Sequence, residues 1–205
     1  MNTYAVYFLI AVMGYLLGSI PFALVIGKVF YQTDIRNYGS KNLGSGNAGR
    51  VLGKKAGLAV MTLDILKVTL AVFIASRLQE GEAAMVLAGL AAATGHCFPL
   101  FAHFKGGKAV ATMYGFLFGM GLFGGYGLIL FFVPLITFLI VLYLGKIIAL
   151  ASIASAVAVT GYLYFISGAS LMFVAAGIFT VVIIVRHKKN LIRIKNHEEN
   201  KISWL

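Results

Sequence analysis

Seven long apolar stretches separated by short loops dominate this chain of 205 residues. A helix needs about 20 apolar residues to cross a bilayer, and most of the stretches approach that length. With 60% hydrophobic and only 11% charged residues, the chain is too apolar for an ordinary water-soluble globule. We therefore expect an all-α integral membrane protein, a single bundle of about seven transmembrane helices that forms one domain over residues 1–205. The stretches cover about residues 4–27, 56–76, 83–103, 109–124, 126–144, 147–166 and 169–185.

Glycine residues predict a break in the first stretch and mark the boundary between the fourth and fifth stretches. The fourth and fifth are separated without a charge, so a re-entrant pair fits residues 109–144 almost as well as two full spans. In the first stretch, the sequence Gly18-Ser19-Ile20-Pro21 predicts a kink or an unwound turn. No basic residue precedes this stretch, so it does not resemble a signal peptide and we expect it in the mature protein. The glycines near the fourth boundary are Gly119, Gly121, Gly124, Gly125 and Gly127.

The basic residues predict the orientation of the bundle. Of 17 Lys and Arg, all but Lys67 and Arg77 fall in segments 28–55, 104–108 and 145–146 and in the part of the chain from residue 186 on. Cytoplasmic loops carry such an excess, so we expect the N-terminus outside and the C-terminus in the cytoplasm. A net charge of +11 indicates an anionic partner, namely lipid head groups, a phosphorylated substrate or nucleic acid. Because the charges gather on one membrane face, we expect no nucleic acid.

The segment of residues 37–50, NYGSKNLGSGNAGR, is rich in hydrogen-bond donors. Its glycines allow backbone N–H groups to converge, its Ser and Asn side chains add neutral donors, and Arg50 offers a bidentate guanidinium. Together these groups suit a phosphate, although a flexible glycine-rich loop explains the composition about as well. The candidate residues are Gly39, Ser40, Asn42, Gly44, Asn47 and Arg50.

A second segment, Lys105-Gly106-Gly107-Lys108, directly precedes the fourth apolar stretch. Free backbone amides and the positive end of a helix dipole would point at whatever lies there, and the lysines add charge. These features predict a second anion site on the same face. The alternative is two ordinary lysines that follow the positive-inside rule. The spacing is not that of a Walker A loop, so nucleotide hydrolysis is not implied.

A third segment follows the last apolar stretch. If its helix continues, His187 and Asn190 lie three residues apart on one face and can contact one ligand. Alternatively, Lys188, Lys189 and Arg193 form a juxtamembrane cluster that binds lipid phosphates. That second interpretation explains the lysines better than it explains His187 and Asn190.

Asp64, Lys67 and His96 are polar residues that lie within apolar stretches. Asp64 and Lys67 are spaced i,i+3, and a structural ion pair is at least as good an interpretation as a catalytic one. His96 either bonds a backbone carbonyl or reaches the loops. The single Cys97 gives no metal-binding spacing and is expected to pack, and neither a serine hydrolase elbow nor a zinc motif is present. We therefore expect neither a metal nor a cofactor. An already activated donor would suit such a site, because positioning and charge stabilisation could carry the catalysis.

The three segments together resemble the motifs of the bacterial membrane acyl-phosphate:glycerol-3-phosphate acyltransferases, the PlsY family. The first resembles Gly-Ser-Gly-Asn-x-Gly-x-x-Asn-x-x-Arg, with Lys41 where glycine is usual. The second is similar to residues 95–99 followed by 104–108, and the third to Arg186-His187 with Asn190 and Arg193. Where the family often has Ser-Leu-Gly-Ser after the fifth span, this chain has Ala149-Leu150-Ala151-Ser152, and Val68 also replaces a usual glycine.

This resemblance implies a seven-helix enzyme of the bacterial cell membrane that transfers a fatty acyl group from acyl phosphate to the 1-hydroxyl of glycerol 3-phosphate. Its partners would be these two substrates and membrane lipids, without a cofactor or an obligate protein partner. A substrate phosphate oxygen would accept the proton, with His187 as the competing base. The alternatives are a transporter or channel for a phosphorylated metabolite, a paralogue that acylates another acceptor, and a structural or lipid-binding protein. By resemblance, the catalytic residues are His187, Arg50 and Lys108, and the substrate-binding residues are Gly39, Ser40, Asn42, Gly44, Asn47, Lys105, Gly106, Gly107, Asn190 and His96.

Overall fold

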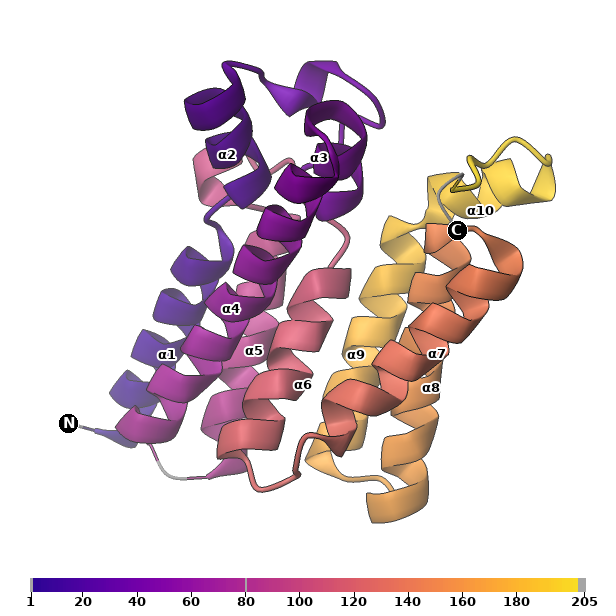
Figure 1. Ribbon diagram of the computed structural model, residues 1–205. Coiled ribbons are helices and arrows are strands. Elements are labelled where there is room, and N and C mark those ends of the chain that lie inside the picture. The colour runs from indigo at the N-terminus through magenta and orange to yellow at the C-terminus, as the bar shows by residue number, and fades with distance from the viewer. Residues whose placement is uncertain (1, 80, 203–205) are drawn as a thin grey trace.

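The computed structural model describes residues 2–79 and 81–202, and over these residues all regular secondary structure is helical (Figure 1). The first half of the chain forms α1 (Thr3–Gly18), α2 (Phe22–Tyr31), η1 (Ile35–Asn37), α3 (Ser45–Leu52), α4 (Lys54–Leu78) and α5 (Glu82–Cys97). The second half forms η2 (Leu100–Ala102), α6 (Val110–Phe123), α7 (Ile129–Gly145), α8 (Ile148–Ser167), α9 (Leu171–Arg186) and α10 (Lys188–Lys195). Each of the seven predicted apolar stretches thus has a helical counterpart.

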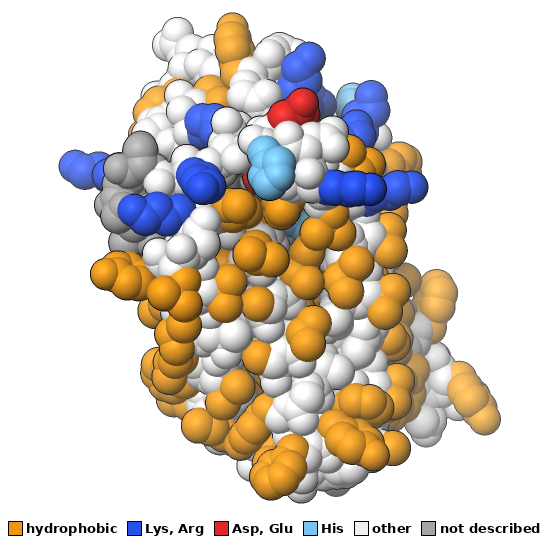
Figure 2. All heavy atoms as spheres, turned by 90° about the vertical axis from the view of Figure 1, so that its right-hand side faces the viewer, with side chains coloured by type: hydrophobic (Ala, Val, Ile, Leu, Met, Phe, Trp, Pro, Cys, Tyr) orange, Lys and Arg blue, Asp and Glu red, His pale blue; other side chains and the backbone are white. Residues whose placement is uncertain are grey.

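The long helices form two groups that stand side by side (Figure 1). One contains α1, α4, α5 and α6, and the other contains α7, α8 and α9. α9 packs against α5 and α6, where the rings of Phe116 and Phe179 stack with centroids 5.2 Å apart. The short helices α2, α3 and α10 lie at the same end of the bundle, with α10 apart from the other two, and we call this the basic end. On the face that Figure 2 shows, lysine and arginine side chains gather there, above a surface of exposed apolar side chains.

Small residues bring α1 and α5 into close contact. Gly14 and Gly18 of α1 face Ala88 and Ala92 of α5. A Cβ at Gly14 would lie 2.8 Å from the carbonyl oxygen of Ala88, and one at Gly18 would overlap the main chain of Ala92. This four-residue spacing of small residues is the common way for two membrane helices to approach each other, because no side chain holds the backbones apart.

The predicted break in the first stretch is confirmed. α1 ends at Gly18 and α2 begins at Phe22, directly after Pro21. A break leaves backbone groups without helical partners, which is costly away from water. Lys67 of α4 satisfies one of them, because its Nζ donates to the carbonyl oxygen of Ile20 at 2.9 Å. The intramembrane lysine therefore has a structural partner.

α6 and α7 are separate antiparallel helices. Gly119 lies inside α6 against Val72 of α4, so it is a packing residue and not part of the break between the two helices. At the far end, the hydroxyl of Tyr126 donates to the Glu82 carboxylate at the start of α5 at 2.7 Å. At the basic end, the N–H of Gly107 donates to the carbonyl oxygen of His96 near the end of α5. α6 thus runs alongside α5 over nearly its whole length, which favours two passes over a re-entrant pair.

By length and composition, four segments in the described part of the chain could each cross a membrane. α9 and α10 would add a fifth if they are taken as one segment bent by 57°, whereas α6 and α7 are shorter apolar helices. Seven spans and an outside N-terminus stay predictions from the sequence. The four segments are Thr3–Tyr31, Lys54–Leu78, Glu82–Ala102 and Ile148–Ser167.

Candidate active site

A cavity of about 670 Å³ lies at the basic end, between the two groups of helices. Its polar walls come from the loop before α3, the start of α6, the junction of α9 with α10 and the C-terminal tail. All but three of the predicted site residues line it, so the structure brings together three segments that are far apart in the sequence. These residues are Gly39, Ser40, Asn42, Gly44, Asn47, Arg50, His96, Lys108, His187 and Asn190.

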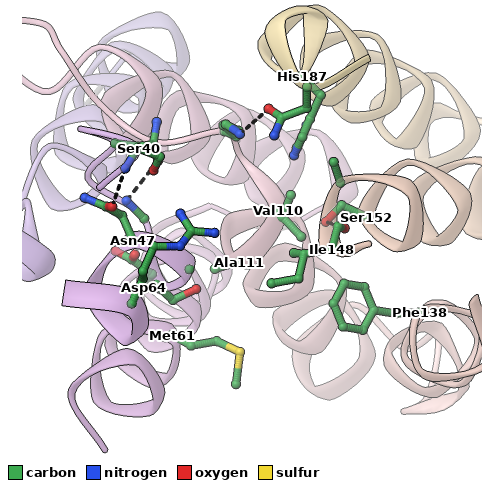
Figure 3. A pocket seen from close by; sticks show the side chains of 18 of the residues that line it. Ser40, Asn47, Met61, Asp64, Val110, Ala111, Phe138, Ile148, Ser152 and His187 are labelled. Carbon is green, nitrogen blue, oxygen red and sulfur yellow. Dashed lines mark hydrogen bonds between the residues drawn. The ribbon is translucent and has the colours of Figure 1, made fainter. Parts of the chain in front are cut away.

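Asn47 holds the loop before α3 in its shape. Its Oδ1 accepts from the N–H of Ser40 at 2.8 Å, and its Nδ2 donates to the carbonyl oxygens of Ile35 and Tyr38 at 3.1 and 3.3 Å. Gly39 has a φ of 58°, and a Cβ there would overlap the Asn47 amide. Because these atoms are already bonded, Asn47 positions the loop, while the exposed Ser40 hydroxyl is open to a ligand (Figure 3).

The start of α3 forms one donor surface of the cavity. Its N-cap residue, Gly44, provides no side-chain cap, and Gly44, Ser45 and Gly46 all line the cavity. The first N–H groups of a helix have no partner within it and carry partial positive charge, which suits an anion. Arg50 lines the cavity from the same helix. Asn42 ties this loop to the second segment, because its Nδ2 donates to the carbonyl oxygen of Gly106 at 3.2 Å.

The second segment does not contact the cavity in the way that the sequence predicted. Lys108 lines it, but Lys105 is exposed and, like Gly106 and Gly107, does not line it. Gly107 packs against the ring of His96, where a Cβ would overlap the ring atoms. The two glycines are therefore close-packing residues that place Lys108. α6 starts directly afterwards without a side-chain cap.

Arg186 of α9 forms hydrogen bonds to the segment that precedes α6. Its Nε donates to the carbonyl oxygen of Gly107 at 3.0 Å, and its Nη2 donates to Gly107 at 2.7 Å and to Gly106 at 3.0 Å. The guanidinium also lies 5.3 Å from the centre of the Phe98 ring. Arg186 thus occupies the carbonyl groups of the glycine pair and fixes the approach of the chain to Lys108.

The helix of the third segment does not continue straight. It bends by 57° at His187, so the two residues do not share the face of one straight helix, although both His187 and Asn190 line the cavity. The Nδ1 of His187 lies 2.8 Å from the carbonyl oxygen of Ile183. Because a carbonyl oxygen only accepts, Nδ1 carries the proton and Nε2 is left as an acceptor. Burial, together with the nearby Lys108, lowers the pKa of His187 to about 4, so the ring is neutral near pH 7.

Lys108 and Asn190 join the second and third segments. The Nζ of Lys108 donates to the Oδ1 of Asn190 at 2.6 Å, which is drawn as a dashed line in Figure 3. Burial lowers the pKa of Lys108 to about 8, although the Glu199 carboxylate opposes this shift. Lys108 therefore remains mostly protonated at neutral pH. Arg193, which the sequence placed either in the third motif or in a lipid-binding cluster, lines the cavity, while Lys188 and Lys189 are exposed and still fit lipid binding.

Sequence reasoning missed the C-terminal tail. Glu199, Asn200, Lys201 and Ile202 line the cavity. The Glu199 carboxylate accepts from the Asn190 amide and from Arg193, both at 2.6 Å. The sequence feature that could have pointed to Glu199 is composition, because this residue is one of only six acidic residues in a strongly basic chain.

Asp64, Lys67 and His96 form a buried polar cluster beside the cavity. The Nζ of Lys67 lies 2.6 Å from the Asp64 carboxylate and 3.2 Å from the Nδ1 of His96. Asp64 and His96 line the cavity, whereas Lys67 reaches back to the break between α1 and α2. Removing one member of such a buried pair leaves an uncompensated charge, which costs about 3–5 kcal/mol. The arrangement favours a structural role for the pair.

An apolar branch continues the cavity between α4, α6, α7 and α8. The ring of Tyr114 meets Phe131 edge-on at 5.7 Å and Phe138 at 6.5 Å between ring centres. Met61 of α4 and Ile148 of α8 line the cavity and are 39% and 37% exposed, so its apolar wall reaches the outer surface of the bundle. The sequence did not single out these residues, because apolar side chains in an apolar helix carry no distinguishing signal.

α8 supplies the last part of the wall. Ala149 and Ser152 both line the cavity and are almost fully buried. The hydroxyl of Ser152 donates to the carbonyl oxygen of Ile148 at 2.8 Å. The alanine that departs from the motif therefore lies at the cavity, where a serine would add a donor. Within the described residues, no three His, Cys, Asp or Glu side chains are grouped so that they could hold a metal ion.

The chain has close relatives among known proteins. A family model described as glycerol-3-phosphate acyltransferase matches residues 8–197. A glycerol-3-phosphate acyltransferase of Streptococcus pneumoniae strain CGSP14 is 44% identical over 202 residues, which cover 94% of this chain and 92% of that protein. The homologue of the same name from S. pneumoniae serotype 4 strain TIGR4 has the same identity and coverage.

Two solved structures share the fold. Both are crystal structures of PlsY, described as an integral membrane glycerol 3-phosphate acyltransferase. The glycerol 3-phosphate form gives a TM-score of 0.88 at 31% identity and covers 96% of each chain. The lysophosphatidic acid form gives 0.85 at 30% identity and covers 96% of this chain and 95% of the other.

Proposed function

The chain belongs to the glycerol-3-phosphate acyltransferase family, and from this premise we propose that its acyl donor is an acyl phosphate and its acceptor the sn-1 hydroxyl of glycerol 3-phosphate. The products are lysophosphatidic acid and phosphate, and the reaction takes place at the cytoplasmic face. Over its described residues the protein is all-helical, and it shares its fold with integral membrane acyltransferases. Family membership also speaks against the transporter interpretation.

The observation that carries this proposal is the two-part cavity. Its polar end gathers Arg50, Lys108 and the uncapped starts of α3 and α6, all of which suit phosphate oxygens. Its apolar branch lies between α4, α6, α7 and α8 and suits an acyl chain. An acyl phosphate combines these two parts in one molecule. Glycerol 3-phosphate requires only the polar end.

The chemistry needs little from the protein beyond positioning and charge. The acceptor hydroxyl oxygen forms a bond to the acyl carbon, the bond from that carbon to the phosphate oxygen breaks, and phosphate leaves with the electron pair. Arg50 and Lys108 stabilise the charge on the leaving phosphate. A mixed anhydride is already activated, so bringing the two substrates together supplies most of the acceleration.

The proton of the acceptor hydroxyl goes to a substrate phosphate oxygen. A phosphate monoester has its second pKa near 6, so its dianion is a stronger base than a histidine with a pKa of about 4. The unprotonated Nε2 of His187 accepts a hydrogen bond from a substrate hydroxyl and orients it. His187 is therefore a binding residue in this mechanism.

The test of the reaction uses purified protein in detergent with palmitoyl phosphate and radiolabelled glycerol 3-phosphate. We expect labelled lysophosphatidic acid acylated at sn-1, and a loss of about 100-fold in kcat/KM for Arg50→Ala and Lys108→Ala. Lys105→Ala is the matched control, because this lysine is exposed outside the cavity, and it should retain wild-type activity. Product formed only from acyl-CoA or acyl-carrier protein would reject the donor. Counterflow of glycerol 3-phosphate in proteoliposomes without acylation would support the transporter instead.

His187→Gln separates the two proton acceptors. If phosphate is the base, this variant raises KM but keeps most of the kcat at saturating substrate, because glutamine still offers a hydrogen-bond acceptor. A collapse of kcat with unchanged substrate binding would instead identify His187 as the general base.

A further inference from the structure

The C-terminal tail folds back over the polar end of the cavity. α10 ends at Lys195, and residues 199–202 line the cavity wall. The N–H of Ile202 donates to the carbonyl oxygen of Lys146, directly after α7, at 2.8 Å. This bond joins the tail to the second group of helices, so that the chain crosses the cavity between α10 and the connection from α7 to α8.

Glu199 places a carboxylate among residues that otherwise suit an anion. Its Oε1 accepts from the amide of Asn190 and its Oε2 from the Nε of Arg193, both at 2.6 Å. The Glu199 side chain is only 10% exposed. Although burial opposes it, hydrogen bonding to Arg193 and Asn190 holds the pKa of Glu199 below its ordinary value, so the carboxylate is ionised at neutral pH.

The same donors are the ones a phosphate would use. The Oδ1 of Asn190 already accepts a hydrogen bond from Lys108. Asn190 can therefore bind an anion only through its Nδ2 hydrogens, and Nδ2 donates to Glu199. A carboxylate and a phosphate both take charge-assisted hydrogen bonds from such groups, and two anions at one site repel each other. Glu199 and a phosphate therefore compete for Asn190 and Arg193.

We propose that Glu199 is an affinity-determining residue, an internal carboxylate that occupies the phosphate site and that substrate phosphate displaces together with the tail. This inference rests on the proposed function, which places phosphate at this end of the cavity. The apparent dissociation constant of a ligand equals its intrinsic value divided by the fraction of molecules in the competent state. Removing the charge of Glu199 raises that fraction and tightens phosphate binding.

The chain offers a matched control next to this residue. Glu198 is exposed and does not line the cavity, so Glu198→Gln makes the same change of charge one residue away. We would compare wild type, Glu199→Gln, Glu199→Ala and Glu198→Gln as full-length protein in detergent. Titration calorimetry measures the Kd of inorganic phosphate, and steady-state kinetics measures the KM for glycerol 3-phosphate.

Both Glu199 variants should lower the Kd of inorganic phosphate and the KM for glycerol 3-phosphate by about fivefold. Glu198→Gln should change neither by more than about twofold. Unchanged phosphate affinity in a folded Glu199 variant would overturn the inference. So would weaker binding, because it would mean that Glu199 holds Asn190 and Arg193 in place for the substrate.

The phosphate titration needs no acyl donor, which separates this inference from the reaction itself. Tighter phosphate binding by Glu199→Gln in a protein that does not use acyl phosphate would reject the proposed donor and keep the inference. Acylation from acyl phosphate with unaltered phosphate affinity in both Glu199 variants would reject the inference and keep the donor.

Discussion

At the scale of single residues, the environment of Lys108 sets how the site responds to pH. In the proposed mechanism this lysine binds phosphate only when it is protonated, and burial lowers its pKa to about 8. Its charge is therefore present below about pH 8 and is lost above it. Because kcat/KM reports the ionisation of the free enzyme, its pH profile should fall on the alkaline side with an apparent pKa near 8.

Lys108→Arg tests this assignment. Arginine stays charged at any pH that the enzyme tolerates, so the alkaline fall should move upward or disappear, even if the variant is less active because its fork binds differently. The measurement is kcat/KM for glycerol 3-phosphate from pH 6 to pH 10. An unchanged alkaline limb in an active Lys108→Arg enzyme would assign the ionisation to another group.

Single residues also show where sequence reasoning worked and where it stopped. Polar residues in an apolar chain are rare, so Ser40, Arg50 and Lys108 could be picked out, and the structure gathers them at one cavity. Lys41 could be recognised only as a departure from the motif. Its φ of 59° supplies the physical reason for the usual glycine, because this left-handed conformation is strained for other residues.

At the scale of helices, the contact between α1 and α5 depends on the absence of side chains. Gly18→Val would force a branched side chain into the main chain of Ala92 and separate the helices, with an expected loss of stability of about 3 kcal/mol. Gly161→Val in α8 is the matched control, because nothing lies within 4 Å of a Cβ at that position. Thermal unfolding in detergent measures the difference, and equal midpoints for both variants would contradict the packing argument.

Arg186 is a positioning residue that connects α9 to the segment before α6. Arg186→Leu removes its bonds to Gly106 and Gly107, and we expect kcat/KM to fall by about 10- to 100-fold. The charge of Arg186 also helps to lower the pKa of Lys108, so the alkaline limb of the pH profile should move upward. Lys188→Leu, an exposed neighbour, should change neither quantity. Loss of activity without a shift of this limb would indicate general misfolding.

Helix positions could be read from the sequence because a helix that crosses a bilayer needs a long, uninterrupted apolar stretch. The bend at His187 could not, since no proline or glycine marks it. The same holds for the packing of Gly106 and Gly107 against His96, which depends on contacts between distant segments. A helix pattern specifies which residues share a face but not which other helix that face meets.

At the scale of the whole molecule, the concentration of basic residues at one end predicts its orientation in the membrane. Lys188→Cys would place a thiol at the basic end, and Ala169→Cys would place one in the loop between α8 and α9 at the opposite end. A membrane-impermeant maleimide applied to intact cells should label Ala169→Cys and spare Lys188→Cys. The native Cys97 is almost fully buried and should not react. The reverse labelling pattern would invert the orientation.

In the proposed function, the apolar branch that reaches the surface through Met61 and Ile148 lets the two substrates come from different phases. An acyl donor that enters along this route is drawn from a two-dimensional pool, whereas glycerol 3-phosphate arrives from three-dimensional solution. Turnover should then follow the mole fraction of donor among the surrounding amphiphiles and not its amount per litre. Adding detergent at constant donor would slow the enzyme by dilution within the interface, with no inhibitor bound.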